Sequence, residues 1–168
     1  LLDRVEVVCL SGGIPLNLPI VQEAVKRGLP LTNDSQVFME SVKAPVVGIT
    51  GSAGKTTTTT IVGRMAKAAV KSSRQAWIGG NIGLPLVEYL DEIAADDIVI
   101  LELSSFQLEQ MSISPNVAAV LNITPNHLDR HGNLAGYVAA KKRLFDHAAP
   151  NATAVVVTDD ADSRGIAA

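Results

Sequence analysis

Short hydrophobic runs alternate with longer amphipathic segments over most of the chain. Beyond residue 45 the runs are rich in valine, isoleucine and leucine, and each has the length of a buried strand. The segments between them repeat their hydrophobic residues with helical spacing. This alternation predicts an α/β fold in which a parallel sheet is flanked by helices on both faces. We expect strands at 46–50, 75–78, 98–103, 117–123 and 154–157, and helices at 56–70, 84–93 and 134–148.

The beginning of the chain follows a different pattern. A strand is expected at 5–10 and a helix at 18–27, and a polar stretch follows them. We place a domain boundary near residues 40–45, which divides the chain into 1–42 and 43–168. The chain opens on leucine rather than methionine, and its last residues stop where a helix is expected to begin. We therefore expect both ends to be cuts in a longer protein.

The composition is globular and only weakly charged, with 47% hydrophobic residues, 18% charged residues and a net charge of −3. Without a basic field, nucleic acid and anionic lipid are not expected partners. No apolar run is long enough to span a bilayer, and Asp3, Arg4 and Glu6 interrupt the segment where a secretory signal would be hydrophobic. The single cysteine, Cys9, excludes an internal disulfide and is expected to be buried in the first strand. We expect a cytoplasmic location without membrane insertion.

A glycine-rich loop follows the strand at 46–50 and precedes a helix. Its glycines let backbone N–H groups face a polyphosphate, which also meets the positive end of the helix. Lys55 would add a point charge on the outer phosphates, and Thr56 a hydroxyl for Mg²⁺. The strict phosphate-loop pattern requires glycine at position 49, whereas the sequence has Ile49 and the glycine is Gly48. The alternative is an ordinary glycine-rich turn. The expected nucleotide-binding residues are Gly51, Ser52, Ala53, Gly54, Lys55, Thr56 and Thr57.

A carboxylate ends the buried run at 98–103. In a parallel sheet the carboxyl ends of the strands meet at one edge, so Glu102 is expected to lie near the phosphate loop. A carboxylate in that place can hold Mg²⁺ directly or through water. The alternative is an acidic side chain at an exposed strand end.

Four stretches of the sequence are informative when taken together. They are Gly48–Thr56, Gly79–Gly83, Leu101–Glu109 and Leu121–His131 followed by Ala139–Lys141. In order and spacing they resemble the muramyl ligase family, and among its members the branch that adds D-glutamate. The displaced glycine of the phosphate loop is also a feature of that branch. The chain departs from the pattern at Ala53, where asparagine is usual, at Asn126, where aspartate is common, and at 11–13, where Ser-Gly-Gly replaces Ser-Pro-Gly.

The resemblance implies a two-step reaction of a P-loop-type central ATPase domain, preceded by the end of a Rossmann-like domain that binds the UDP substrate. ATP would phosphorylate the carboxylate of UDP-N-acetylmuramoyl-L-alanine, and the amine of D-glutamate would attack the acyl phosphate. By this resemblance Lys55, Glu102, His127 and Lys141 are the catalytic residues. Mg²⁺ would be held by Thr56, Glu102, His127 and a carbamylated Lys141. The substrate would be held by Asn81, Ser104, Gln107 and His127.

Three other functions stay open at this point. The chain could belong to a sister muramyl ligase or a folylpolyglutamate-type ligase, to a P-loop switch or transport ATPase, or to a non-catalytic binding module. Because the third domain of the family is absent from the sequence, the chain alone is expected to be inactive. A zinc site at His127, Asp129 and His131 is disfavoured, because zinc prefers several nitrogen or sulfur ligands in tetrahedral array.

The expected helix at 134–148 places a lysine within its hydrophobic face. At about 100° per residue its apolar residues cluster on one side, with Lys141 near the centre, Lys142 toward the edge and Arg143 pointing away. Burial of a charged lysine is costly, so its pKa should fall. The neutral amine is the form that reacts with CO₂. The alternative is that the ammonium of Lys141 extends past the helix to water.

Overall fold

Five parallel strands form the central sheet of the computed structural model, which describes residues 2–159 and 161–166. Their spatial order is β4–β5–β3–β6–β7, so the strand that leads into the phosphate loop lies in the middle. This confirms the predicted parallel α/β fold. The strands are β3 (Val46–Thr50), β4 (Ala76–Gly80), β5 (Ile98–Glu102), β6 (Val117–Val120) and β7 (Thr153–Val156).

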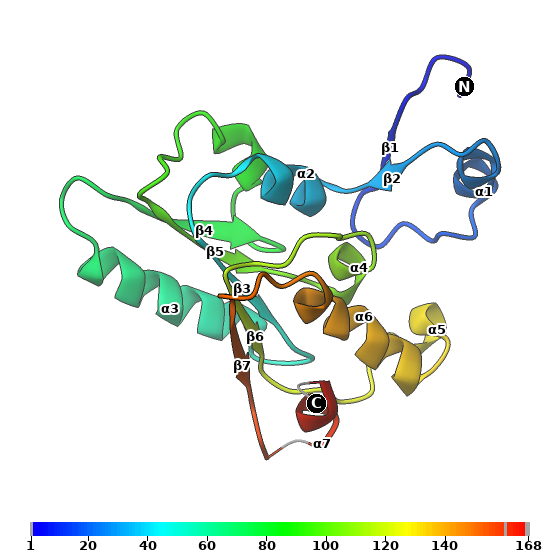
Figure 1. The fold of residues 1–168 in the computed structure, drawn as a ribbon. Helices are drawn as coiled ribbons and strands as arrows, with labels where there is room; N and C mark the ends of the chain where they lie inside the picture. Colours follow the sequence, from blue (N-terminus) through cyan, green and yellow to red (C-terminus); the bar gives the residue numbers. More distant parts are fainter. Residues whose placement is uncertain (1, 160, 167–168) are drawn as a thin grey trace.

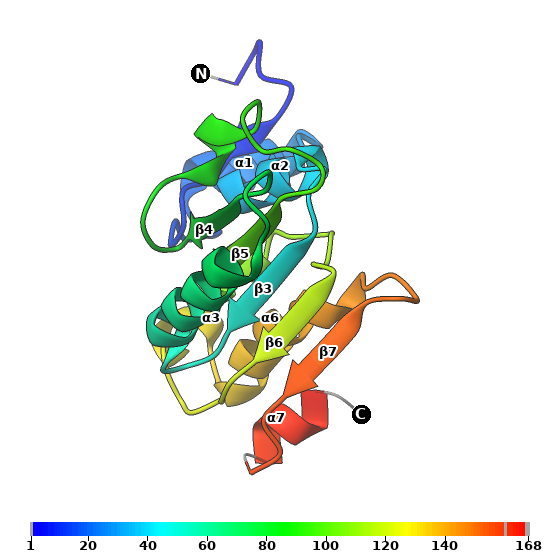
Figure 2. The ribbon, with the colours of Figure 1, turned by 90° about the vertical axis from the view of Figure 1, so that its left-hand side faces the viewer.

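Helices cover both faces of this sheet. α3 (Lys55–Ala69) lies on one face, and α4 (Ser105–Leu108) and α6 (Leu134–Asp146) lie on the other (Figures 1 and 2). Burial of β3 and β5 on both sides explains why they read as continuous hydrophobic runs rather than as alternating ones, whereas edge strand β7 is mostly exposed. Two shorter helices, α5 (Leu128–His131) and α7 (Ala161–Ile166), complete this part. No helix of residues 2–159 and 161–166 is long and apolar enough to cross a membrane.

The beginning of the chain forms a separate part with its own two-stranded parallel sheet. The elements of this part are β1 (Val8–Cys9), α1 (Pro19–Lys26), β2 (Leu31–Thr32) and α2 (Asp34–Ser41), and the sheet pairs β1 with β2. The expected strand at 5–10 is therefore paired over two residues only. Cys9 is exposed, contrary to the prediction. A strand in so small a sheet has too little covering structure to bury both of its faces.

Hydrogen bonds join this first segment to α4 and to the residues that follow α4. The Asn33 side chain accepts the N–H of Gln36 as the cap of α2, and it donates to the carbonyl of Gln107 at 2.8 Å. Gln107 Nε2 donates to Ser35 Oγ at 2.8 Å, and Gln36 Nε2 donates to Ser112 Oγ at 2.9 Å. The boundary at residues 42–43 stays a prediction, but the two parts are in polar contact.

The helix expected at 84–93 is wrong in extent. Only one 3₁₀ turn, η1 (Leu86–Tyr89), forms in that region. Leu84 still pairs with Gly79 in an isolated β-bridge, so the chain remains extended up to Pro85. The turn then presses Leu86 into the core against β4. The hydrophobic spacing is therefore satisfied without a long helix.

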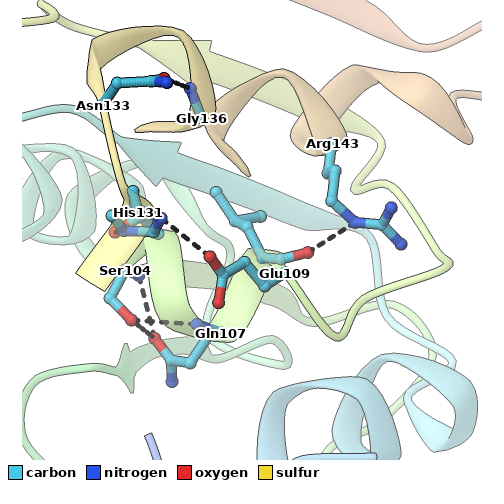
Figure 3. Close-up of polar contacts among 9 residues, drawn as sticks. Ser104, Gln107, Glu109, His131, Asn133, Gly136 and Arg143 are labelled. Carbon is cyan, nitrogen blue, oxygen red and sulfur yellow. Dashed lines mark hydrogen bonds and ion pairs between the residues drawn. The ribbon is translucent and has the colours of Figure 1, made fainter. Parts of the chain in front are cut away.

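Arg143 also departs from the prediction, because it does not point away from the protein. It is half-buried, and its guanidinium donates to the carbonyl of Leu108 at 3.0 Å and to that of Met111 at 2.7 Å. These carbonyls lie at and just after the end of α4, where a helix leaves its last acceptors unpaired. Arg143 thus attaches α6 to α4 (Figure 3).

Candidate functional site

The phosphate loop connects β3 to α3 and leaves the first turn of the helix open. Gly54 precedes the helix with φ +81°, a conformation that glycine adopts without strain. The first intrahelical bond runs from Thr58 N to Gly54 O, so the N–H groups of residues 54–57 have no acceptor within the helix. No side chain caps this end, and its first turn holds no acidic residue. The arrangement suits an anion, which would meet free N–H donors and the positive end of the helix dipole.

The loop is attached to the segment that follows β6. Asn122 accepts the N–H of Ala53 at 2.9 Å, donates to its carbonyl at 3.0 Å and accepts the N–H of Ser52 through its own backbone carbonyl at 2.8 Å. Ser52 Oγ donates to the carbonyl of Thr124 at 3.0 Å and lies 3.0 Å from the hydroxyl of Tyr137. The loop is therefore preorganised by two neighbouring elements, and the N–H groups of Ser52 and Ala53 are already paired.

Glu102 lies at the centre of the polar residues at this edge of the sheet. Its side chain is only 1% exposed, yet both carboxylate oxygens are paired: Oε2 accepts the Thr56 hydroxyl at 2.8 Å and Oε1 accepts the Asn81 amide at 2.9 Å. Gly80 lets β4 approach closely, because a Cβ there would meet the Glu102 carbonyl. The prediction that Glu102 lies beside the phosphate loop is confirmed, and the exposed strand end is excluded.

Two lysines converge on one carbonyl of the loop. Lys55 Nζ donates to Gly51 O at 3.0 Å and to Ser52 O at 3.2 Å. Lys141 Nζ donates to the same Gly51 carbonyl at 3.0 Å and to Thr50 Oγ1 at 3.3 Å. Lys141 is 1% exposed, as the helical face predicted. Burial, and secondarily the positive charge of Lys55, lower the pKa of Lys141 to about 7.

Tyr137 is one of three residues of this site that the sequence analysis did not identify. Its ring lies 4.6 Å from Lys141 Nζ, and its hydroxyl lies beside Ser52 in the phosphate loop. Burial raises the pKa of Tyr137, which keeps the hydroxyl protonated. Asn122 and Thr50 were also missed. Their only signal is a polar side chain next to a hydrophobic strand, which occurs at many positions without function.

Other predicted residues lie apart from the Glu102 cluster. His127 is exposed, has the positive φ of +52° that is rare outside glycine, and packs edge-on against Phe106. Ser104 and Gln107 form a reciprocal capping box at the start of α4 (Figure 3). Gln107 is 4% exposed and uses its amide oxygen on Ser104 and its amide nitrogen on Ser35. Among the described contacts, neither His127 nor Gln107 bonds to Glu102.

The ligands available at this edge suit a hard cation. Among residues 2–159 and 161–166 no group of three or more His, Cys, Asp and Glu side chains is arranged around a common metal position. Mg²⁺ does not require such a group, because it binds through one or two carboxylates, waters and substrate phosphates. The carboxylate of Glu102 and the hydroxyl of Thr56, joined at 2.8 Å, fit that requirement.

Comparison with known proteins gives one consistent family. Residues 49–168 match the Mur ligase middle domain. Over 163 residues the chain is 42% identical to the UDP-N-acetylmuramoylalanine–D-glutamate ligase of Symbiobacterium thermophilum, which covers 97% of this chain and 35% of that protein. The chain therefore spans about a third of the length of the curated relatives it matches.

Two solved structures share the fold. One is the UDP-N-acetylmuramate:L-alanyl-γ-D-glutamyl-meso-diaminopimelate ligase of Neisseria meningitides, with a TM-score of 0.63 and 17% identity over 96% of this chain and 54% of that one. The other is the MurF ligase of Thermotoga maritima in complex with ADP, with a TM-score of 0.60 and 23% identity over 98% of this chain and 47% of that one. The phosphate loop, the buried carboxylate and these likenesses agree, and the chain belongs to the Mur ligase family.

Proposed function

We propose that this chain carries the ATP-binding part of a ligase that joins UDP-N-acetylmuramoyl-L-alanine to D-glutamate in peptidoglycan precursor synthesis. The observation that carries the proposal is the position of Glu102, held between Thr56 of the phosphate loop and Asn81 of the next loop. The names of relatives at about 40% identity over nearly the whole chain support the choice of substrates.

The first step is transfer of the γ-phosphoryl group of ATP to the L-alanine carboxylate. The open N–H groups of residues 54–57 and the ammonium of Lys55 bind and orient the polyphosphate, so that the attacking and leaving oxygens are in line. Lys55 now rests on loop carbonyls, and it can exchange them for phosphate oxygens by rotating its side chain. No protein nucleophile is required, since the carboxylate oxygen itself attacks phosphorus and ADP leaves.

Mg²⁺ would be held by Thr56 and Glu102, and it would neutralise charge on the β- and γ-phosphates. The family resemblance assigns a second ion to Glu102, His127 and a carbamate on Lys141. Lys141 lies at the loop, buried and with a lowered pKa, which favours the neutral amine that a carbamate requires. His127 stands on an exposed turn, so its part in this second position is the least supported of the three.

The UDP-linked substrate would enter where the first segment meets the main sheet. An open polar pocket of about 310 Å³ lies there, lined by residues of both parts, including Gly12, Asp34, Asn81 and Gln107. Asn81 therefore faces both the pocket and Glu102. In the second step the amine of D-glutamate attacks the acyl carbon, the C–N bond forms, phosphate leaves with the C–O bond electrons, and the amine loses a proton to solvent.

The test is a ligation assay on the full-length protein. UDP-N-acetylmuramoyl-L-alanine, ATP, Mg²⁺ and D-glutamate should give ADP, phosphate and the amide in equal amounts. A folylpolyglutamate-type ligase would instead need a folate, and a switch or transport ATPase would release phosphate without either substrate. The 168-residue chain alone should form no amide, because a closing domain must exclude water from the acyl phosphate. ADP release without amide by the full-length protein would refute the proposal.

A further inference from the structure

A row of three polar side chains, two of them buried and the third, Glu109, partly exposed, joins α5 to α4 and the residue after it. The His131 side chain is 1% exposed, and both of its ring nitrogens are paired. Nδ1 lies 2.8 Å from Glu109 Oε1 (Figure 3). Nε2 lies 3.0 Å from Ser105 Oγ. A carboxylate only accepts, so Nδ1 carries the proton, and Nε2 of a neutral ring accepts the Ser105 hydroxyl. The ring is thereby fixed in position and in tautomer.

The same histidine is packed between two aromatic rings. It stacks on Phe106 with 5.2 Å between ring centroids and 6° between planes, and it meets Tyr137 at 5.2 Å and 59°. Phe106 also receives the His127 ring at 5.1 Å and the Arg130 guanidinium at 5.1 Å. Three residues of the α5 turn therefore contact one ring of α4.

His127 needs such support because its backbone is in a costly conformation. A non-glycine residue with φ +52° is strained by about 1–3 kcal/mol and persists only where its surroundings hold it. Its carbonyl accepts the N–H of His131 at 3.1 Å, so the strained residue is bonded directly to the anchored one. Among the described residues, the aromatic partner of the His127 ring is Phe106, at an interplanar angle of 61°.

We propose that Glu109, His131 and Ser105 form a positioning row that clamps the α5 turn onto α4 and thereby fixes the place of His127. Among the hydrogen bonds and ion pairs of the described residues, none joins the row to the phosphate loop or to the Glu102 side chain. Its consequence for catalysis rests on the proposed function, in which His127 belongs to the second metal position.

Variants of His131 can separate the parts of the row. His131→Phe keeps the stack on Phe106 and removes both hydrogen bonds. His131→Asn can retain the bond to Glu109, because the asparagine amide occupies about the place of Nδ1. Glu109→Leu removes the bond between Glu109 and His131 by changing the partly exposed partner. It replaces the histidine variants in the test if those variants fold poorly. His147→Phe is the matched control, since it makes the same substitution at an exposed helix end.

The first measurement is independent of catalysis. Amide hydrogen exchange of the full-length protein should become at least tenfold faster in the peptide that covers 128–133 for His131→Phe and Glu109→Leu. His131→Asn should give a smaller change, and His147→Phe should leave this peptide unchanged. Unchanged exchange in both His131→Phe and Glu109→Leu would overturn the row, whatever the enzyme does.

The second measurement is a double-mutant cycle with His127→Ala in the ligation assay. His131→Phe alone should lower kcat/KM for the UDP-linked substrate about 10- to 100-fold and leave KM for ATP within twofold. In the His127→Ala background it should cost less than twofold more, because its effect passes through His127. Multiplying effects would overturn positioning through His127. If wild type makes no amide at all, the proposed function fails, and hydrogen exchange alone decides whether the row clamps the turn.

Discussion

Lys141 gives the sharpest physical prediction, because an ionisable amine is held where a charge is costly. It is 1% exposed and lies over the Tyr137 ring, and in the part of the chain that the structure describes its hydrogen-bond acceptors are Gly51 O and Thr50 Oγ1. No carboxylate is among its described partners. Burial, and then the charge of Lys55, lower its pKa from 10.5 to about 7.

The sign of the pH dependence follows from the proton count. Above the folded pKa of about 7 the native lysine has lost its proton, whereas the unfolded lysine keeps it up to 10.5. Stability rises with pH wherever the unfolded state binds more protons. Between pH 7 and pH 9 the folded protein should therefore gain about 2 to 3 kcal/mol from this residue, at roughly 1.4 kcal/mol per pH unit. The gain ceases above the unfolded pKa, and below pH 7 the penalty stays constant.

Urea unfolding of the 168-residue chain in CO₂-free buffer measures this gain. Lys141→Met keeps the length of the side chain and removes the titration, so the difference in unfolding free energy between wild type and variant should change by 2 to 3 kcal/mol from pH 7 to pH 9. Lys142→Met, at the exposed neighbouring position, should show no such change. A difference independent of pH would mean that Lys141 titrates as in water, and the reasoning would fail.

The same amine should react with CO₂. With ¹³C-labelled bicarbonate at pH 8, Mg²⁺ and nucleotide, the full-length protein should give a carbamate resonance that Lys141→Met lacks and Lys142→Met retains. Lys141→Ala should be inactive and partly restored by acetate, since a free carboxylate can replace the two oxygens of the carbamate. Full activity of Lys141→Ala, or greater damage by Lys142→Ala, would contradict the role.

Three further outcomes are expected. Lys55→Ala should abolish nucleotide binding in calorimetry and leave the circular dichroism spectrum unchanged, because the hydrogen bonds described for its ammonium go to loop carbonyls and the fold does not depend on them. Near wild-type affinity for nucleotide would refute this. Glu102→Ala should lower turnover of the full-length protein by about 10²–10³ or more, and a loss below about tenfold would remove Glu102 from the site. Thr59→Val should raise the free energy of unfolding in urea by about 1 kcal/mol, because the Thr59 hydroxyl is buried without a hydrogen-bond partner in the described part of the chain. A destabilised variant would show that this hydroxyl is hydrogen-bonded in the native protein.

The sequence predicted the sheet well because its central strands, β3 and β5, are buried on both faces. Continuous runs of branched residues have one stable solution there, a parallel sheet between helices. Hydrophobic periodicity predicted the wrong secondary structure where the spacing reflects which residues are buried and not the backbone conformation. Residues 84–93 have helical spacing, yet the bridge from Leu84 to Gly79 holds the chain extended and only η1 forms. The pairing of β1 over two residues depends on how much structure covers it, which no local pattern records.

In the site, position along a strand predicted more than residue type did. Glu102 and the phosphate loop meet because parallel strands end at one edge, and this follows from topology alone. The bonds of Asn122, Tyr137 and the His131 row join elements far apart in the sequence, so no local pattern predicts them. Gln107 stays a predicted substrate residue. It lines the polar pocket, while its amide bonds to Ser104 and Ser35, contacts that its place in the motif did not predict.

The sequence also treated Lys55 and Lys141 as separate, whereas they share the Gly51 carbonyl. Two ammonium groups at one acceptor repel each other, and this repulsion is one cause of the lowered pKa of Lys141. A polyphosphate bound at Lys55 counters that charge and so favours the protonated form of Lys141, and by linkage a protonated Lys141 favours phosphate binding. Phosphate binding and the state of Lys141 are therefore coupled through a single loop carbonyl. In CO₂-free buffer, raising the pH through 7 should accordingly weaken the binding of metal-free nucleotide in wild type and have little effect in Lys141→Met.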